Sequence, residues 1–104
     1  MGKNGDIDPL TNIMSKALRH KIGSIVNENE FYAEKYAKDA ENIMNEAERI
    51  AERQNWNRDD KAVIKEKLRK KLHKELEEKD FIDNRKFSLM DEEIAKALEA
   101  FNLL

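Results

Sequence analysis

The histidines are the first side chains to consider for acid–base or metal chemistry, and their surroundings favour neither. His20 lies in Arg-His-Lys and His73 in Leu-His-Lys-Glu-Leu, and neighbouring cations disfavour both a protonated imidazole and a bound metal ion. Neither histidine belongs to a Glu-x-x-His or His-Glu-x-x-His spacing, so the patterns of helical di-metal sites and zinc proteases are missing. We therefore expect both histidines at the surface and predict no metal site.

The carboxylates are numerous, but their spacing is that of helix surfaces and helix starts. Glu34, Glu41 and Glu48 recur every seven residues, which is typical of a solvent-facing line on a helix. Asp59 and Asp60 fit the first turn of a helix, where the helix dipole stabilises acids. General acid–base catalysis needs a carboxyl group in an apolar pocket or beside a second carboxyl group, and no such pocket is indicated.

Other catalytic patterns are missing as well. The chain has no cysteine, which excludes cysteine catalysis, a disulfide framework and a Cys-based zinc site. It also has no Gly-rich phosphate loop, no calcium loop and no serine in a nucleophile motif. The sequence therefore predicts that the protein is not an enzyme, and it indicates no cofactor and no small-molecule substrate.

A basic stretch could instead contact phosphate groups. Between Lys61 and Lys74 the only acid is Glu66. At about 100° per residue, some of these lysines share one helix face, away from the leucines. The candidate phosphate-contacting residues are Lys67, Lys70, Lys71 and Lys74. The stretch has no Asn, Gln, Phe, Tyr or Trp to read or stack on bases, so only sequence-independent, salt-sensitive contact with a nucleic-acid backbone is predicted. The alternative is a solvated face, or one that acidic helices of the same fold neutralise.

The elements that would position these residues are helices. Val and Thr, which strands favour, occur only as Val26, Val63 and Thr11, whereas Ala, Leu, Glu and Lys dominate; these are good helix formers. All glycines and the one proline precede residue 24, so little interrupts a helix beyond that point. The sequence predicts an all-α fold, a small bundle of about four helices with mostly antiparallel neighbours.

The first two predicted helices are marked by Asp, Pro and Asn. The first begins at Asp8, with Pro9 at its first helical position, and continues through Gly23 to about residue 26. We expect residues 1–7 to form a flexible N-terminal tail and residues 8–104 a single helical domain. The second helix spans about residues 30–53, with Asn27 or Asn29 as its N-cap.

Two similar turns predict the starts of the later helices. Asn57 and Asp60 resemble a capping box for a third helix over about residues 58–78, and Trp56 before it is expected to act as a hydrophobic staple. Ser88 and Asp91 form the same pattern before the fourth helix. The connection over residues 79–87 is expected to be pinned to the core by three apolar residues, Phe81, Ile82 and Phe87.

The second helix carries two apolar lines, more than one neighbour needs. Alanines occupy one line, and Tyr36, Ile43 and Ile50 follow the other at seven-residue spacing. Small side chains let a second helix approach closely, either within the chain or between two chains; the alternative is an ordinary amphipathic core helix. The candidate partner interface comprises residues of this helix and of the apolar chain end: Ala33, Tyr36, Ala37, Ala40, Ile43, Met44, Ala47, Ile50, Phe101 and Leu104.

Charge is sorted along the chain. The 104 residues include 20 Lys or Arg and 22 Asp or Glu, for a net charge of -2. The net charges of consecutive segments alternate: +2 for residues 1–27, -4 for 28–56, +3 for 57–79 and -3 for 80–104. A basic third helix is therefore predicted between acidic ones, and either these helices neutralise one another or one of them faces a partner.

These observations predict a non-catalytic helical module that mediates protein–protein association, with a copy of itself or with a helical partner. No apolar stretch is long enough to span a membrane, and the first residues lack the apolar segment of a signal peptide, so we expect a cytoplasmic protein without membrane partners. A nucleic-acid accessory protein that uses the basic third helix is the alternative. A stand-alone regulator, such as an inhibitor or antitoxin, is a third hypothesis.

Overall fold

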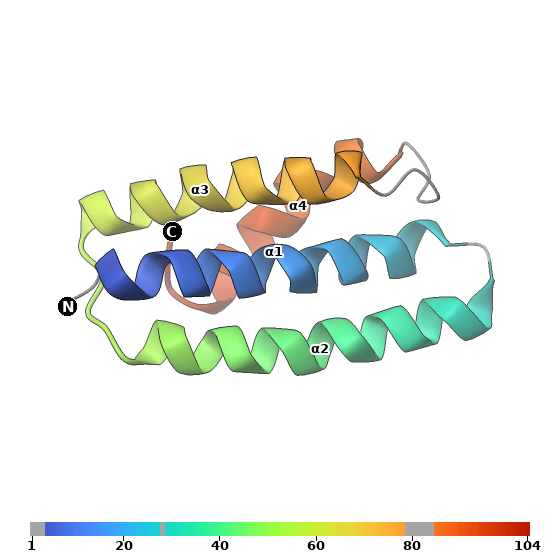
Figure 1. The fold of residues 1–104 in the computed structure, drawn as a ribbon, viewed down its shortest axis with the longest axis horizontal. Helices are drawn as coiled ribbons and strands as arrows, with labels where there is room; N and C mark the ends of the chain where they lie inside the picture. The colour runs from blue at the N-terminus through green and yellow to red at the C-terminus, as the bar shows by residue number, and fades with distance from the viewer. Residues whose placement is uncertain (1–3, 28, 79–84) are drawn as a thin grey trace.

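The structure is a computed structural model, and it describes residues 4–27, 29–78 and 85–104. Its helices are α1 (Asn4–Val26), α2 (Glu30–Glu52), α3 (Arg58–Glu77) and α4 (Arg85–Ala100). No strand occurs in the described residues. The chain reverses direction after each helix, so that α1 and α3 run one way and α2 and α4 the other (Figure 1). The predicted all-α fold and four-helix bundle are confirmed.

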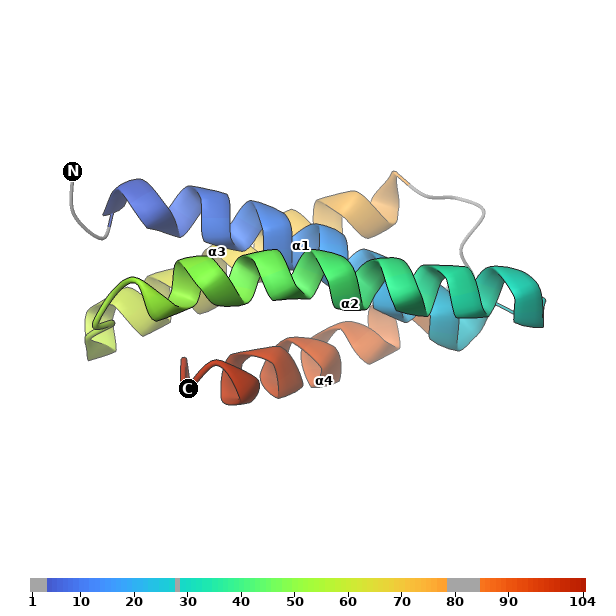
Figure 2. The ribbon, with the colours of Figure 1, turned by 90° about the horizontal axis from the view of Figure 1, so that it is seen from below.

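Helix α1 is the centre of the bundle, because each of the other helices packs against it (Figures 1 and 2). Leu10, Met14, Leu18 and Ile22 are at most 1% exposed. By contrast, α2 packs closely against α1 alone: within the described ranges, no Cα atom of α2 lies within 8 Å of one in α3 or α4. The bundle is therefore open between α2 and the helices on the other sides of α1.

The leucine stripe of α3 joins it to two neighbours. Its buried apolar residues recur every four positions: Ile64, Leu68, Leu72 and Leu76. A strict four-residue spacing drifts around the helix, and α3 accordingly packs against both α1 and α4. Each fully buried Leu or Ile contributes about 1.5–3 kcal/mol to folding stability, so this narrow stripe is a main source of the stability of the bundle.

Helix α1 begins earlier than the sequence predicts. The helix starts at Asn4, and Pro9 lies inside it rather than at its first position. Ile7, which falls in the predicted tail, is 3% exposed, and Asp6 accepts a hydrogen bond from Nε2 of Gln54 at 2.8 Å. These long-range contacts offset the backbone hydrogen bond that Pro9 cannot donate. Residues 1–3 of the predicted tail lie outside the described residues.

Two of the predicted N-caps are confirmed. The side chain of Asn29 accepts hydrogen bonds from the amides of Phe31 and Tyr32. Asn57 and Asp60 form a reciprocal capping box, with distances of 2.8 and 3.0 Å between side-chain oxygens and backbone nitrogens. Trp56 packs against the core and donates its Nε1–H to the carbonyl of Ala51 at 2.8 Å.

The predicted cap at Ser88 is wrong. Helix α4 already begins at Arg85, and the Ser88 hydroxyl donates to the carbonyl of that residue at 2.7 Å. Serine makes such a bond inside a helix when its side chain turns back along the preceding turn. Phe87 accordingly belongs to α4 rather than to a connection. Phe81 and Ile82 lie outside the described residues.

Candidate protein-binding groove

The histidines lie in separate local contacts. Nδ1 of His20 is 2.8 Å from the carbonyl oxygen of Lys16, and its ring meets the edge of Tyr36. His73 lies 3.2 Å from a carboxylate oxygen of Glu77. Across the part of the chain that the structure describes, no group of three or more His, Cys, Asp or Glu residues is arranged to hold a metal ion.

Two of the lysines proposed to contact phosphate face α1. Nζ of Lys67 lies 2.9 Å and Nζ of Lys71 lies 3.3 Å from the same Oδ1 atom of Asp8. Lys71 also donates to Oγ1 of Thr11 at 2.6 Å. The hydrogen bonds from Lys67 and Lys71, together with their charges, lower the pKa of the Asp8 carboxyl below its usual range. These two cations are therefore engaged within the fold.

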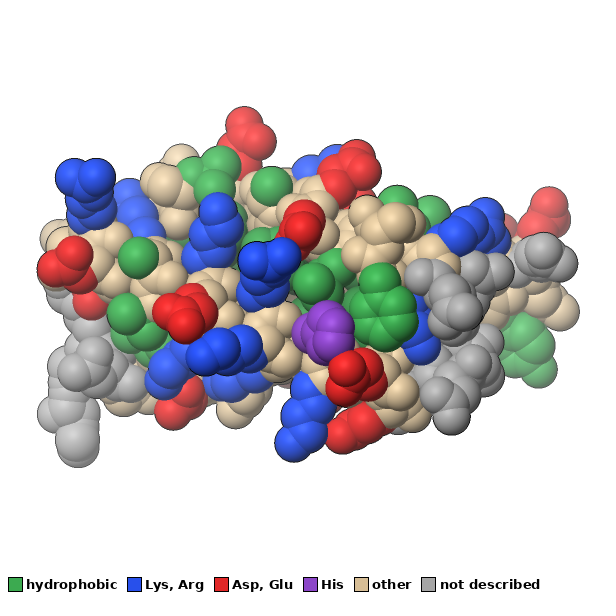
Figure 3. All heavy atoms as spheres, turned by 90° about the horizontal axis from the view of Figure 1, so that it is seen from above, with side chains coloured by type: hydrophobic (Ala, Val, Ile, Leu, Met, Phe, Trp, Pro, Cys, Tyr) green, Lys and Arg blue, Asp and Glu red, His purple; other side chains and the backbone are tan. Residues whose placement is uncertain are grey.

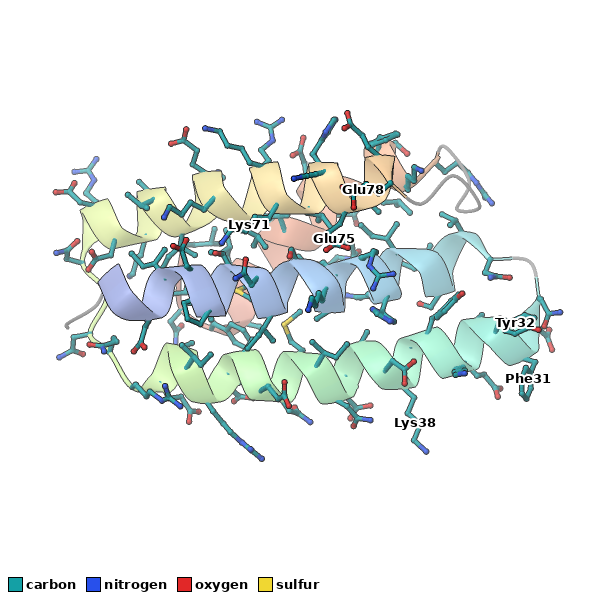
Figure 4. All side chains as sticks on the ribbon, viewed as in Figure 1. Phe31, Tyr32, Lys38, Lys71, Glu75 and Glu78 are labelled. Atoms are coloured by element: carbon teal, nitrogen blue, oxygen red, sulfur yellow. The ribbon has the colours of Figure 1, made fainter. Side chains whose placement is uncertain are left out.

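The remaining lysines of that set do not form one basic face. Lys70 forms an ion pair with Glu66 of its own helix at 3.3 Å. Lys74 and Lys71 line a hollow of about 310 Å³ between α1 and α3, but Glu75 and Glu78 line the same hollow. Figure 4 shows Lys71 and Glu75 between these two helices. Figure 3 shows basic and acidic side chains interleaved over the α3 side of the molecule.

Further ion pairs join α3 to its neighbours. Nε of Arg19 on α1 lies 2.9 Å from Oε2 of Glu75. On the other side of α3, Nε of Arg69 lies 3.1 Å from Oδ1 of Asp91 on α4. Part of the alternating charge in the sequence is therefore neutralised between the helices.

Helix α2 differs from α3, because its charged side chains lack ion-pair partners among the described residues. Within the described ranges, no ion pair involves a charged side chain of Glu30–Glu52. Acidic residues outnumber basic ones along this helix. Lys38 points away from α1 (Figure 4). The exposed side of α2 therefore carries an uncompensated negative charge.

A groove lies between α2 and α4, and α1 forms the floor of its first part. One part, of about 440 Å³, is lined by Leu18 of α1, Met44 of α2 and Ala97 of α4, among others. A second part, of about 480 Å³, continues past Glu48 towards Trp56. Ala100 lines both parts, so they adjoin. Figure 2 shows that α2 and α4 run in the same direction.

The α4 wall of the groove contains a buried carboxylate. Glu93 is 1% exposed; its Oε1 lies 2.6 Å from Nζ of Lys21, and its Oε2 lies 3.2 Å from Nζ of Lys96. The contact with Lys21 is an ion pair without the alignment of a hydrogen bond. Burial raises the pKa of Glu93, but the proximity and charges of Lys21 and Lys96 outweigh it and hold the pKa below its usual range. Glu92 also pairs with Lys96, at 3.2 Å, so that two carboxylates balance the two lysines.

The α2 wall is acidic. Glu41, Glu48 and Glu52 line the groove from this helix and are exposed. Two of them belong to the seven-residue line of glutamates that the sequence predicts on a solvent-facing side. The groove thus combines apolar side chains at its base with carboxylates along one edge.

The residues of the predicted partner interface fall into three groups. Ala40, Ala47 and Ile50 are buried within the chain, so the close approach that the alanines allow occurs between α2 and α1. The partly exposed residues are Ala33, Tyr36, Ile43, Met44 and Phe101. Ala37 and Leu104 are exposed. The groove brings together Ala37, Ala40 and Met44, and Phe101 lines its continuation.

The buried Glu93 and the exposed Phe31 and Tyr32 were not predicted from the sequence. Glu93 follows Met90 by three residues and precedes Ala97 by four, so helical periodicity could have placed it on the apolar face. Phe31 and Tyr32 are exposed at the start of α2, far from the N-terminus, with ring centroids 5.6 Å apart (Figure 4). No spacing signal distinguishes these exposed aromatic residues from buried ones.

Comparisons of the chain with protein-family models, with curated proteins and with solved structures found no match. Among the described helices, none is both long enough and apolar enough to cross a membrane.

Proposed function

We propose that the chain is a non-catalytic helical module that associates with another protein through the exposed side of α2 and the groove beside it. The observation that supports this proposal is the isolation of α2, which, in the described structure, packs closely against α1 alone. Tyr36 and Ile43 on one edge, and Ala37 and Met44 on the other, remain partly or fully exposed. Apolar surface bordered by polar residues is typical of sites where proteins bind one another.

A helical partner fits this surface better than an extended peptide. The described residues contain no strand whose edge could pair with a peptide, whereas a groove between two helices accepts the apolar face of a third helix. Such a partner would bury the edges of α2 that the chain itself leaves uncovered.

A position-specific photo-crosslinking experiment tests the proposal. A photoreactive residue replaces Ala37, which lines the groove, or Val63, which is 41% exposed on α3. We expect protein adducts in cells of the source organism from position 37 and not from position 63. An adduct of twice the chain's mass would identify a second copy as the partner. Equal labelling from both positions, or none from position 37, would refute an interaction through this surface.

Nucleic-acid binding through Lys67, Lys70, Lys71 and Lys74 is the alternative, and the geometry supports it less. Phosphate contact would compete with the pairing of two of these lysines to Asp8. Anisotropy with a labelled duplex at ~50 mM salt, where backbone binding is strongest, separates the two functions. We expect no binding; tight, salt-sensitive binding that is lost when the four lysines are changed to Glu would favour the alternative.

A further inference from the structure

We infer that the occupant of the groove between α2 and α4 is a basic amphipathic helix of another protein, which directs its cationic residues towards α2. This inference rests on the proposed function and adds the chemistry of the partner. It follows from the shape of the groove, from its charges, and from what a second copy of the chain could offer.

The base of the groove suits a helix. Leu18 and Ala40 are buried at its floor, and Ala37, Ala97 and Ala100 present only methyl groups along its walls. Small side chains allow the axis of an added helix to come close. From Ala37 to Glu52 the groove follows α2 for about 22 Å at 1.5 Å per residue, which matches a helix of about 15 residues.

The walls of the groove differ in charge. On the α2 wall, Glu41, Glu48 and Glu52 have no ion-pair partner among the described residues. On the other side of the groove, Lys21 of α1 pairs with Glu93, and Lys96 of α4 pairs with both Glu92 and Glu93, so these two cations and two carboxylates balance. The uncompensated charge is therefore negative and lies along one edge, so a cationic flank of the partner is favoured on that side.

A lysine at the far end of the groove would repel the cations of a partner there. Lys61 lines the second part of the groove near Trp56. The cations of a partner are therefore expected opposite Glu41 and Glu48 rather than beyond the end of α2.

A second copy of the chain does not offer a matching helix. Its α2 would bring its own row of carboxylates against Glu41 and Glu48, and like charges in contact disfavour association. Its basic helix, α3, turns Ile64, Leu68, Leu72 and Leu76 into its own core. The exposed side of α3 has only Ala62 and Val63 as apolar residues, too few to follow the length of the groove.

The direct test uses two synthetic peptides of about 15 residues, whose length follows from the groove. One carries Leu and Ala on one helical face and Lys on the other; its counterpart carries Glu in place of every Lys. Fluorescence anisotropy with the full chain is expected to show at least tenfold tighter binding of the Lys peptide, weakening as salt is raised. Equal affinities, or a preference for the Glu peptide, would overturn the inference.

A matched pair of double variants separates the groove from general charge attraction. Glu41→Lys with Glu48→Lys reverses the groove wall. Asp39→Lys with Glu46→Lys makes the same charge change at the same seven-residue spacing, about 200° around the helix from the first pair. We expect the first pair to weaken binding of the Lys peptide at least tenfold and the second to weaken it much less. Equal weakening would show that binding is not localised to the groove.

A second matched pair tests the apolar part of the site. Ala100→Arg places a long cation where both parts of the groove meet, whereas Ala95→Arg places it on an exposed position of α4 outside the groove residues. Binding of the Lys peptide is expected to fall at least tenfold in the first variant and to persist in the second. Circular dichroism checks whether both variants keep their helices. Unchanged binding by a folded Ala100→Arg variant would contradict the assignment.

Failure of this inference and failure of the proposed function have different signatures. If neither peptide binds specifically but position 37 still yields protein adducts, the chain associates with a partner of other chemistry. If the Lys peptide binds in the groove but no adduct forms in cells, the groove can bind a basic helix, but the proposed function in cells is refuted.

Discussion

At the scale of single residues, Glu93 shows how the fold tolerates a buried charge. A carboxylate withdrawn from water is stable only when it is well paired. The side chains of Lys21 and Lys96, which supply the pairing, are themselves 43% and 56% exposed. Both cations therefore retain much of their hydration while they neutralise Glu93, and the carboxyl group stays ionised.

Replacing Glu93 should lower the stability of the protein by an amount that depends on pH. Because the folded-state pKa of Glu93 is lowered, its stabilisation is fully present above the ordinary glutamate value, about 4.3, and is lost as the pH falls through the folded-state pKa. Glu93→Gln is expected to lower the free energy of unfolding by about 1–2 kcal/mol at neutral pH. Urea denaturation from neutral pH to about pH 3 should show the two proteins converging.

Glu92→Gln is the matched control for that measurement. Glu92 pairs with the same lysine, at 3.2 Å, but its side chain is 61% exposed. Exposed pairs contribute little, so this variant should change stability far less than Glu93→Gln. If Glu93→Gln lowered the free energy of unfolding by the same amount at all pH values, the effect would come from packing and not from charge.

At the scale of the helices, Asn57 and Ser88 have the same kind of sequence pattern but different structures. Asn57 is a true N-cap with a reciprocal partner. Ser88 lies inside α4 and bonds back to Arg85. We expect Asn57→Ala to cost about 1 kcal/mol of folding free energy and Ser88→Ala to change it by less than about 0.5 kcal/mol. Thermal and urea unfolding of the two variants measures this; equal losses would contradict the assignment of Ser88 to the interior of the helix.

The same pair of residues shows what the sequence can predict about helix boundaries. The caps at Asn29 and Asn57 involve residues no more than three positions apart, so a local pattern suffices to find them. The first turn of α4 instead makes tertiary contacts: Lys86 is buried, and the Phe87 ring contacts His73. A local pattern carries no information about these contacts.

The candidate site was predictable only in part for a similar reason. Helical periodicity places Lys67 and Lys71 away from the leucines, but not against Asp8, which is more than fifty residues earlier in the chain. It also predicts Glu41 and Glu48 on an exposed line. That this line borders a groove depends on the separation of α2 from α4, which is a property of the packing.

At the scale of the whole molecule, the attachment of α2 to one neighbour gives the bundle an uneven stability. The buried residues of α2 begin at Ala40 and continue with Ala47, Ile50 and Ala51. The first ten residues of the helix contain none. In α1, by contrast, buried residues run from Ile7 to Val26. Segments with few buried contacts open locally at a lower free-energy cost than the core.

Native-state hydrogen exchange should resolve this gradient. We expect the amides of residues 34–39 to exchange through local opening, at a smaller free energy than those of residues 44–51, and both to be less protected than the centre of α1. The Lys peptide described above should add protection mainly to α2, because a ligand stabilises only the conformations in which its site is formed. Uniform protection along α2 before the peptide is added would mean that α2 opens only with the whole bundle. In that case binding would protect all helices alike, and the open side of α2 would be a rigid surface already formed before the partner arrives.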